Sequence, residues 1–144
     1  AIASLKARRN GERQAVIRRQ MKAIMTEKVG IFREDRALNE AVEDLGELKA
    51  RYRDVILDHK GDAFNYDLVD TLELAGMLEL AEVTALAALK RTECRGSHWR
   101  IDSPGRNDGE WLRHSLAYYE PAGRPRLEYA GVLVTKYAPE ERRY

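Results

Sequence analysis

The chain has 144 residues, of which 44% are hydrophobic and 34% charged. This length fits one domain around one core, so residues 1–144 are expected to form a single domain. No apolar run approaches the roughly 18 residues that a membrane helix needs, and the N-terminus has no signal-peptide pattern. Because Cys94 is the only cysteine, an internal disulfide and a cysteine-based metal cluster are excluded.

The net charge of +1 hides a strong segregation along the chain. Residues 1–33 contain nine Lys or Arg and two acids, whereas residues 61–82 contain six acids and no Lys or Arg. A basic first helix occurs in some nucleic-acid-binding proteins. We expect no nucleic-acid partner here, because the acidic run would repel phosphate and no groove-reading motif follows. A solvated face, or one that docks on an acidic neighbour, is the more ordinary interpretation.

Hydrophobic periodicity predicts three helices, at about residues 10–28, 35–60 and 65–92. The second helix has a narrow apolar stripe and charges elsewhere, so one of its sides is expected in water. The third is apolar around most of its circumference, which indicates burial on several sides. Short turns between these helices predict an antiparallel three-helix bundle, similar to a spectrin repeat, over about residues 10–92.

Two details are predicted at the helix ends. Gly30 lies where the first helix should end, and Ile31 and Phe32 are expected to pack back on the bundle. His59 is expected at the end of the second helix, facing the helix dipole.

The character of the chain changes after residue 92. Residues 93–110 are irregular and rich in Gly, Pro, Asn and Asp. Two β-prone runs, 112–119 and 126–135, flank a turn-forming segment and predict a short hairpin. The expected fold is therefore mainly α: a three-helix bundle followed, over residues 93–144, by an irregular ionic loop, a short β-hairpin and an extended C-terminal tail.

The ionic segment, residues 91–108, alternates charges in sign and also contains a histidine and a tryptophan. A long irregular segment in a compact domain is usually functional or disordered. Here the tryptophan and the balanced charges disfavour disorder, because arginine–carboxylate pairs can hold irregular backbone in one shape. Glu93 and Arg95 are expected to be structural partners, with each other or with nearby charges such as Arg91, Arg100 and Asp102.

Two interpretations of this segment compete. It is either a salt-bridged brace at the end of the third helix or an active site with His98 as acid or base. The brace is favoured, because the apolar pattern indicates a packed bundle rather than a pocket. His98 and His114 lack a third ligand at useful spacing, so no metal site is expected. Without a paired base, Cys94 is interpreted as structural.

The same segment resembles a known family. The motif Arg91-Thr-Glu93-Cys-Arg95-Gly-Ser-His98 is followed by Arg100-x-Asp102-x-Pro-x-Arg106-x-Asp108 and then by Trp111-x-x-His114. This order resembles the C-terminal signature of succinate dehydrogenase and fumarate reductase flavoproteins, which reads Arg-x-Glu-Ser-Arg-Gly-Ala-His, an Arg-Asp-Asp stretch and Trp-x-x-His-Thr. Residues 29–33, 127–129 and 142–144 resemble further parts of that family.

The departures from the family pattern are small. Cys94 replaces the usual Ser, Ser97 the usual Ala, and Asn107 the first Asp of the Arg-Asp-Asp stretch. They leave L-aspartate oxidase and adenylylsulfate reductase, which share this ancestry, as alternatives. A stand-alone helical interaction module is the alternative from another class.

The resemblance implies a piece of a larger flavoprotein. In this family an N-terminal dinucleotide domain binds FAD, and a capping domain closes over a dicarboxylate. Neither those segments nor a Gly-x-Gly-x-x-Gly motif is present in this sequence. No catalytic, cofactor-binding or metal residue is therefore expected here; FAD belongs to the parent subunit, and the isolated chain is expected to be inactive. The motif residues are expected to be structural or interfacial: Arg91, Glu93, Arg95, His98, Arg100, Asp102, Arg106, Asp108, Trp111 and His114.

The resemblance also implies partners. The FAD-binding domain of the same subunit is the expected partner, with an iron–sulfur subunit as a second candidate. Neither nucleic acid nor direct membrane insertion is expected. The expected location is the cytoplasm, with membrane association only through other subunits of the parent complex.

Overall fold

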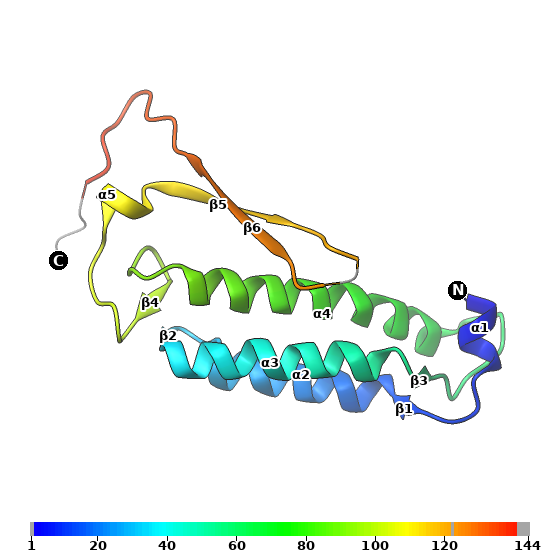
Figure 1. The fold of residues 1–144 in the computed structure, drawn as a ribbon. Coiled ribbons are helices and arrows are strands. Elements are labelled where there is room, and N and C mark those ends of the chain that lie inside the picture. The colour runs from blue at the N-terminus through cyan, green and yellow to red at the C-terminus, as the bar shows by residue number, and fades with distance from the viewer. Residues whose placement is uncertain (1, 122, 141–144) are drawn as a thin grey trace.

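The computed structural model describes residues 2–121 and 123–140. Three long helices, α2 (Gln14–Lys28), α3 (Asp35–Tyr52) and α4 (Tyr66–Lys90), lie side by side, and each runs opposite to the one before it (Figure 1). The expected mainly helical class is confirmed. Within the described residues, no helix is long and apolar enough to cross a membrane.

The core lies between these three helices. The predicted stripe of α3 is buried as expected, and so is one side of α4 around Leu74, Leu78 and Ala85. The opposite side of α4 is not covered, since Val69, Leu72 and Leu80 are exposed. Helix α4 packs against α2, α3 and β5, so the expected burial on several sides is confirmed, although this one strip stays exposed. Glu73 and Gly76 are exposed between these apolar residues.

Helix α3 ends earlier than predicted. It stops at Tyr52, and the next apolar pair forms strand β3 (Val55–Ile56), parallel to β1 (Glu12–Arg13). A short helix that the sequence did not predict, α1 (Ile2–Ala7), buries Leu5 beside this strand pair. His59 consequently lies beyond the helix, and its backbone N–H donates to Asp67 at 3.1 Å. The predicted role of His59 at the helix dipole is wrong.

The strand pair β1–β3 depends on a close backbone approach at Gly11. This residue has φ +154°, and a Cβ there would lie 1.9 Å from the carbonyl oxygen of Asp54. Gly11→Ala is expected to destabilise the chain by about 2 kcal/mol, because the strand must move or adopt a strained backbone. Urea unfolding of Gly11→Ala should be compared with that of Gly46→Ala, which has open space on α3. Equal stability of the two variants would contradict the expectation.

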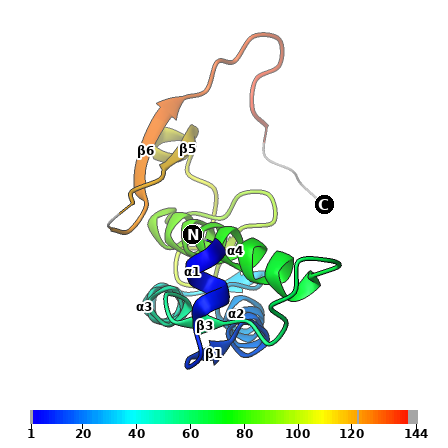
Figure 2. The same cartoon turned by 90° about the vertical axis from the view of Figure 1, so that its right-hand side faces the viewer.

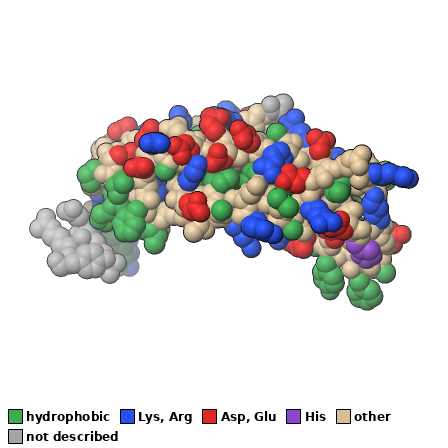
Figure 3. All heavy atoms as spheres, turned by 90° about the horizontal axis from the view of Figure 1, so that it is seen from below, with side chains coloured by type: hydrophobic (Ala, Val, Ile, Leu, Met, Phe, Trp, Pro, Cys, Tyr) green, Lys and Arg blue, Asp and Glu red, His purple; other side chains and the backbone are tan. Residues whose placement is uncertain are grey.

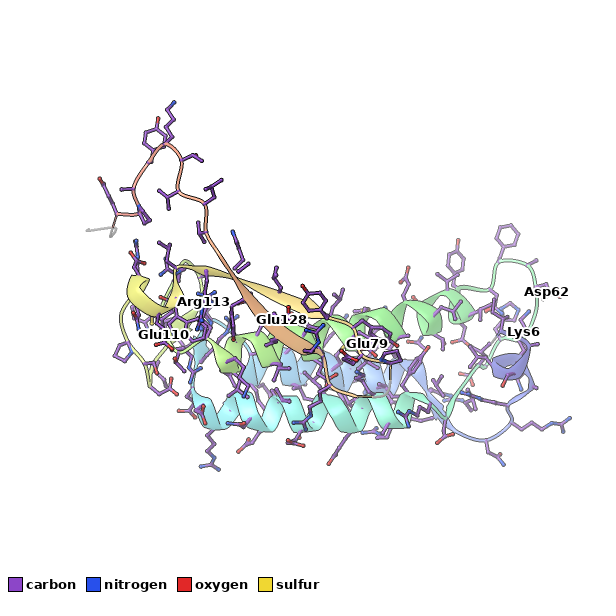
Figure 4. The ribbon with its side chains drawn as sticks, turned by 45° about the horizontal axis from the view of Figure 1, so that its top comes forward. Lys6, Asp62, Glu79, Glu110, Arg113 and Glu128 are labelled. Carbon is purple, nitrogen blue, oxygen red and sulfur yellow. The ribbon has the colours of Figure 1, made fainter. Side chains whose placement is uncertain are left out.

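The loops at the same end are tied together by charge. Lys6 on α1 forms an ion pair with Asp62, in the loop before α4 (Figure 4). Asn65 caps α4 by accepting from the N–H of Leu68 at 2.8 Å. These contacts fix the turn between α3 and α4, which lies far from the ionic segment.

A second strand pair closes the opposite end of the helices. Strand β2 (Phe32–Arg33) runs parallel to β4 (Trp99–Arg100), with Phe32 opposite Trp99. Ile31 and Phe32 are 65% and 72% exposed, so the prediction that they pack back on the bundle is wrong. The backbone pairing to β4 turns these side chains outward instead.

The chain after β4 forms α5 (Asp108–Trp111) and an antiparallel hairpin of β5 (Arg113–Tyr118) and β6 (Arg126–Gly131). The hairpin was predicted, although its second strand is shorter than expected. It stands on one side of α4, away from α2 and α3 (Figure 2). Residues 132–140 contain no helix or strand, and the end of the predicted tail, 141–144, lies outside the described residues.

Candidate functional site

The ionic segment is built around the carboxylate of Glu93, whose side chain is fully buried. Arg95 donates to both of its oxygens, from Nε at 2.7 Å and from Nη2 at 3.0 Å. Arg91 donates to Oε1 at 2.6 Å, and the backbone N–H of Asn107 donates to Oε2 at 2.9 Å. Burial raises the pKa of Glu93, but the donors from Arg95, Asn107 and Arg91 together hold it below its ordinary value. Glu93 is therefore an ionised, fully bonded acceptor.

The same cluster continues outward through Asp108. Arg95 Nη2 donates to Asp108 at 2.6 Å, and Arg106 forms a two-point pair with the same carboxylate. Arg106 and Arg95 hold the pKa of Asp108 well below its ordinary range. Arg106 also donates to the carbonyl oxygen of Glu140 at 2.5 Å, which ties the tail to this cluster.

A second cluster surrounds Arg100, whose side chain is 1% exposed. Its Nε and Nη2 each donate to Asp102 at 2.7 Å, as a bidentate pair. Its Nη1 donates to carbonyl oxygens at the end of α4, those of Ala88, Leu89 and Arg91. The last carbonyls of a helix have no partner within it, so this guanidinium caps α4. The Arg100 pair lowers the pKa of Asp102 to about 2.

His98 connects the ends of α2 and α4. Arg33 donates from Nη1 to His98 Nδ1 at 2.6 Å, and His98 Nε2 lies 2.9 Å from the carbonyl oxygen of Arg91. Arginine can only donate, so Nδ1 accepts and the proton is on Nε2. Arg33 itself caps α2 by donating to the carbonyl oxygens of Val29 and Gly30. Burial, with the nearby arginines, lowers the pKa of His98.

The hairpin is anchored on the buried ring of Trp111. The guanidinium of Arg113 lies 4.5 Å from the ring centroid and that of Arg91 lies 5.0 Å from it. Tyr129, across the hairpin, meets Trp111 edge-on at 5.4 Å. Figure 4 shows Arg113 beside Glu110 at the end of the hairpin near α5. Each such stack contributes roughly 0.5–2 kcal/mol, so the hairpin is held to the ionic segment rather than free.

The ionic segment has few of the features that catalysis or metal binding needs. Among the residues that the structure describes, no three His, Cys, Asp or Glu are grouped as a metal would need. A cavity of about 420 Å³ lies elsewhere, between α3, α4 and the hairpin turn. Charged groups of its lining are paired: Lys49 lies 2.8 Å from Glu79 and 2.6 Å from Glu82. The ionic segment is a set of closed ion pairs rather than a pocket with free acid or base groups.

The structure brings together nearly all the residues singled out in the sequence. His114 is the exception, since it lies exposed on β5 opposite Ala130. Sequence reasoning missed two members, Arg33 and Asp35: the first bonds His98, and the backbone N–H of the second donates to Asp102 at 2.8 Å. Both lie more than 60 residues before their partners, and the only signal was Arg33's place in the family-like turn.

His98 gives this site a pH dependence. Folding lowers the pKa of His98 from 6.5, so the native state favours the neutral ring. The contribution of His98 to stability is therefore fully present above pH 6.5 and is lost as the pH falls through the lower pKa of the folded state. We expect the free energy of unfolding to decrease between about pH 6.5 and 5, before Asp102 begins to protonate. Urea titrations at both pH values measure this. His98→Gln should abolish the decrease, whereas His114→Gln should retain it; an identical decrease in all three proteins would contradict the assignment.

Comparison with known proteins identifies the source of this motif. Residues 18–144 match the family model described as "Fumarate reductase flavoprotein C-term". The fumarate reductase flavoprotein subunit of Haemophilus influenzae is 36% identical over 99% of this chain, which covers 24% of that protein. The succinate dehydrogenase flavoprotein subunit of Rickettsia bellii is 37% identical over 88% of the chain, which covers 21% of that protein.

A solved structure agrees with these relatives. The quinol fumarate reductase flavoprotein of E. coli superimposes with a TM-score of 0.93 at 35% identity, over 97% of this chain and 24% of that one. The chain thus spans about a quarter of the length of the relatives it matches. With the motif, the fold and these matches in agreement, this chain belongs to the C-terminal domain family of succinate dehydrogenase and fumarate reductase flavoprotein subunits.

Proposed function

We propose that this domain is a non-catalytic brace that packs on the FAD-binding part of its flavoprotein, whose activity is the FAD-dependent interconversion of succinate and fumarate. The observation that carries the proposal is the closure of the ionic segment. Both oxygens of Glu93 are bonded, Arg100 is bonded to Asp102 and to helix carbonyls, and His98 is fixed in one tautomer by two partners. Groups bonded in this way stabilise a shape and have no free capacity for substrate.

The rest of the proposal follows from this role. The helices act as an antiparallel three-helix bundle, which gives the brace a rigid support. FAD is held by the parent subunit, and this domain binds no cofactor, metal or nucleic acid. The FAD-binding domain is the direct partner and an iron–sulfur subunit the second. The proposed location is the cytoplasm, with any membrane association made through other subunits of the complex.

Arg95→Ala tests the brace directly. Arg95 is 29% exposed and shares Glu93 with Arg91, so its loss should reduce the free energy of unfolding by about 1–3 kcal/mol. In the whole flavoprotein subunit, the expected result is a lower melting temperature with an unchanged Michaelis constant for succinate. Arg36→Ala, which removes an arginine that is 85% exposed, is the control and should change neither. Unchanged melting with a large rise in the Michaelis constant would instead make Arg95 a substrate-binding residue.

A further inference from the structure

Two charged side chains of the ionic segment are buried, while apolar side chains beside one of them face outward. Arg100 and Glu93 are buried, whereas Trp99 and Ile101, on either side of Arg100, are 49% and 53% exposed. Alternation along an extended strand explains this: once Arg100 points inward to cap α4, its neighbours must point outward. The buried Arg100 thus fixes the direction in which its two apolar neighbours face.

Strand β2 adds two more apolar side chains at the same place. The register sets Phe32 beside Trp99, with ring centroids 6.3 Å apart in an edge-on contact, and Ile31 precedes it. We call Ile31, Phe32, Trp99 and Ile101 the end patch. Figure 3 shows hydrophobic side chains gathered at its left side, at the end of the helices where β2 and β4 lie.

The end patch is preorganised by contacts within the chain. Its two strands are paired, and the N–H of Ile101 donates to the carbonyl oxygen of Arg33 at 2.9 Å. Beneath it, Arg33 is bonded to His98 and Arg100 to Asp102. Large aromatic side chains on a prearranged surface are typical centres of protein interfaces, because little further ordering is needed on binding.

We propose that the end patch is a docking surface for another part of the same flavoprotein polypeptide, which would offer an apolar face with a basic rim. This inference rests on the proposed function. The relatives are about four times as long as this chain, so most of the flavoprotein surface available to cover the patch belongs to that polypeptide. Glu34 and Asp35, both exposed, directly follow β2 in the chain, and a basic rim on the partner would complement them, although Asp35 also lies 3.6 Å from Arg100.

The exposed side of α4 is a weaker candidate for this contact. Its apolar residues, Val69, Leu72 and Leu80, are separated by the exposed Glu73 and Gly76. Tyr66, at the start of α4, is also exposed, but it is in no ring pair with another described aromatic, and the face has no cross-strand support. The end patch is the more concentrated and more rigid of the two surfaces.

Hydroxyl-radical footprinting of the whole FAD-loaded subunit tests the proposal without any substitution. Oxidation rates of Phe32 and Trp99 are compared between the native and the urea-unfolded subunit, with the buried Trp111 as the protected reference. If the patch is covered, both rates should fall at least about tenfold on folding, as for Trp111. If it is open, they should fall by no more than about twofold, as exposures of 72% and 49% imply, and the proposal is overturned.

A matched pair of variants gives a second measurement. Phe32→Ser with Trp99→Ser should lower the melting temperature of the whole subunit, whereas Phe64→Ser, at a residue 87% exposed near the other end, should not. Equal melting temperatures would count against docking. Phe32 and Trp99 could remain accessible to oxidation while Arg95→Ala still lowers the melting temperature and leaves the Michaelis constant unchanged. That result would reject the docking surface and keep the proposed bracing function.

Discussion

Replacing Arg100 by methionine is expected to lower the free energy of unfolding by about 2–3 kcal/mol, because helix carbonyls around this buried side chain lose their donor, while the Asp102 side chain, 31% exposed, keeps access to water. Methionine keeps much of the aliphatic stem but none of the donors. Asp102 then loses both bonds of its bidentate pair, and Ala88 and Leu89 lose the donor that caps the end of α4. Each unsatisfied buried carbonyl adds to the loss of the charge pair.

Urea unfolding of the chain at pH 7 measures this loss. Arg36→Met is the control, because Arg36 is 85% exposed and its pair with Glu40 lies on the helix surface. A second variant, Arg100→Met with Asp102→Asn, removes the stranded charge and should recover part of the stability. A loss below about 1 kcal/mol for Arg100→Met, similar to that of an exposed pair, would show that Arg100 does not hold the end of α4.

The helices were predictable because their information is local. The stripe of α3 repeats at helical spacing and is buried as predicted. The end of α3 was not predictable, because Val55 and Ile56 continue the apolar stripe in the sequence. Their true partner is β1, whose approach depends on Gly11, more than 40 residues earlier.

The contacts of the candidate site also differ in whether local or long-range sequence information determines them. Glu93 and Arg95 are two residues apart, and their pairing follows from alternating charge. The contact of Arg33 with His98 joins positions 65 residues apart, and no periodicity indicates it. The direction of Ile31 and Phe32 was mispredicted for the same reason, since a parallel pairing with β4 decides it. The sequence therefore predicts ion pairs between close neighbours in the chain, but not contacts between loops that are far apart in it.

Replacing Glu93 by glutamine is the other change with a large expected effect. The side chain keeps its shape, but two guanidinium groups, of Arg91 and Arg95, lose their shared buried counter-ion. The amide NH₂ also faces donors rather than acceptors on one side. The free energy of unfolding at pH 7 is expected to fall by about 3–5 kcal/mol. Glu110→Gln, at a side chain 58% exposed and 4.0 Å from Arg113, is the control and should cost less than about 1 kcal/mol.

The pH dependence of this loss separates charge from shape. Because the pKa of Glu93 is lowered on folding, its contribution is fully present above the ordinary value of 4.5 and is lost as pH falls through the lower folded value. The difference between wild type and Glu93→Gln should therefore shrink as pH falls below about 4. A loss caused by disturbed packing alone would stay constant with pH.

A double-mutant cycle with Arg95→Met completes the test. If Glu93 and Arg95 act as one unit, the double variant should be less destabilised than the sum of the two single variants, because neither charge is left without the other. We expect a coupling of about 1–3 kcal/mol, limited by Arg91, which also shares the carboxylate. Strict additivity would mean that each residue acts through separate contacts. The fully buried Glu93 would then stabilise the segment through Arg91 and the backbone of Asn107 alone, and Arg95 would act through Asp108.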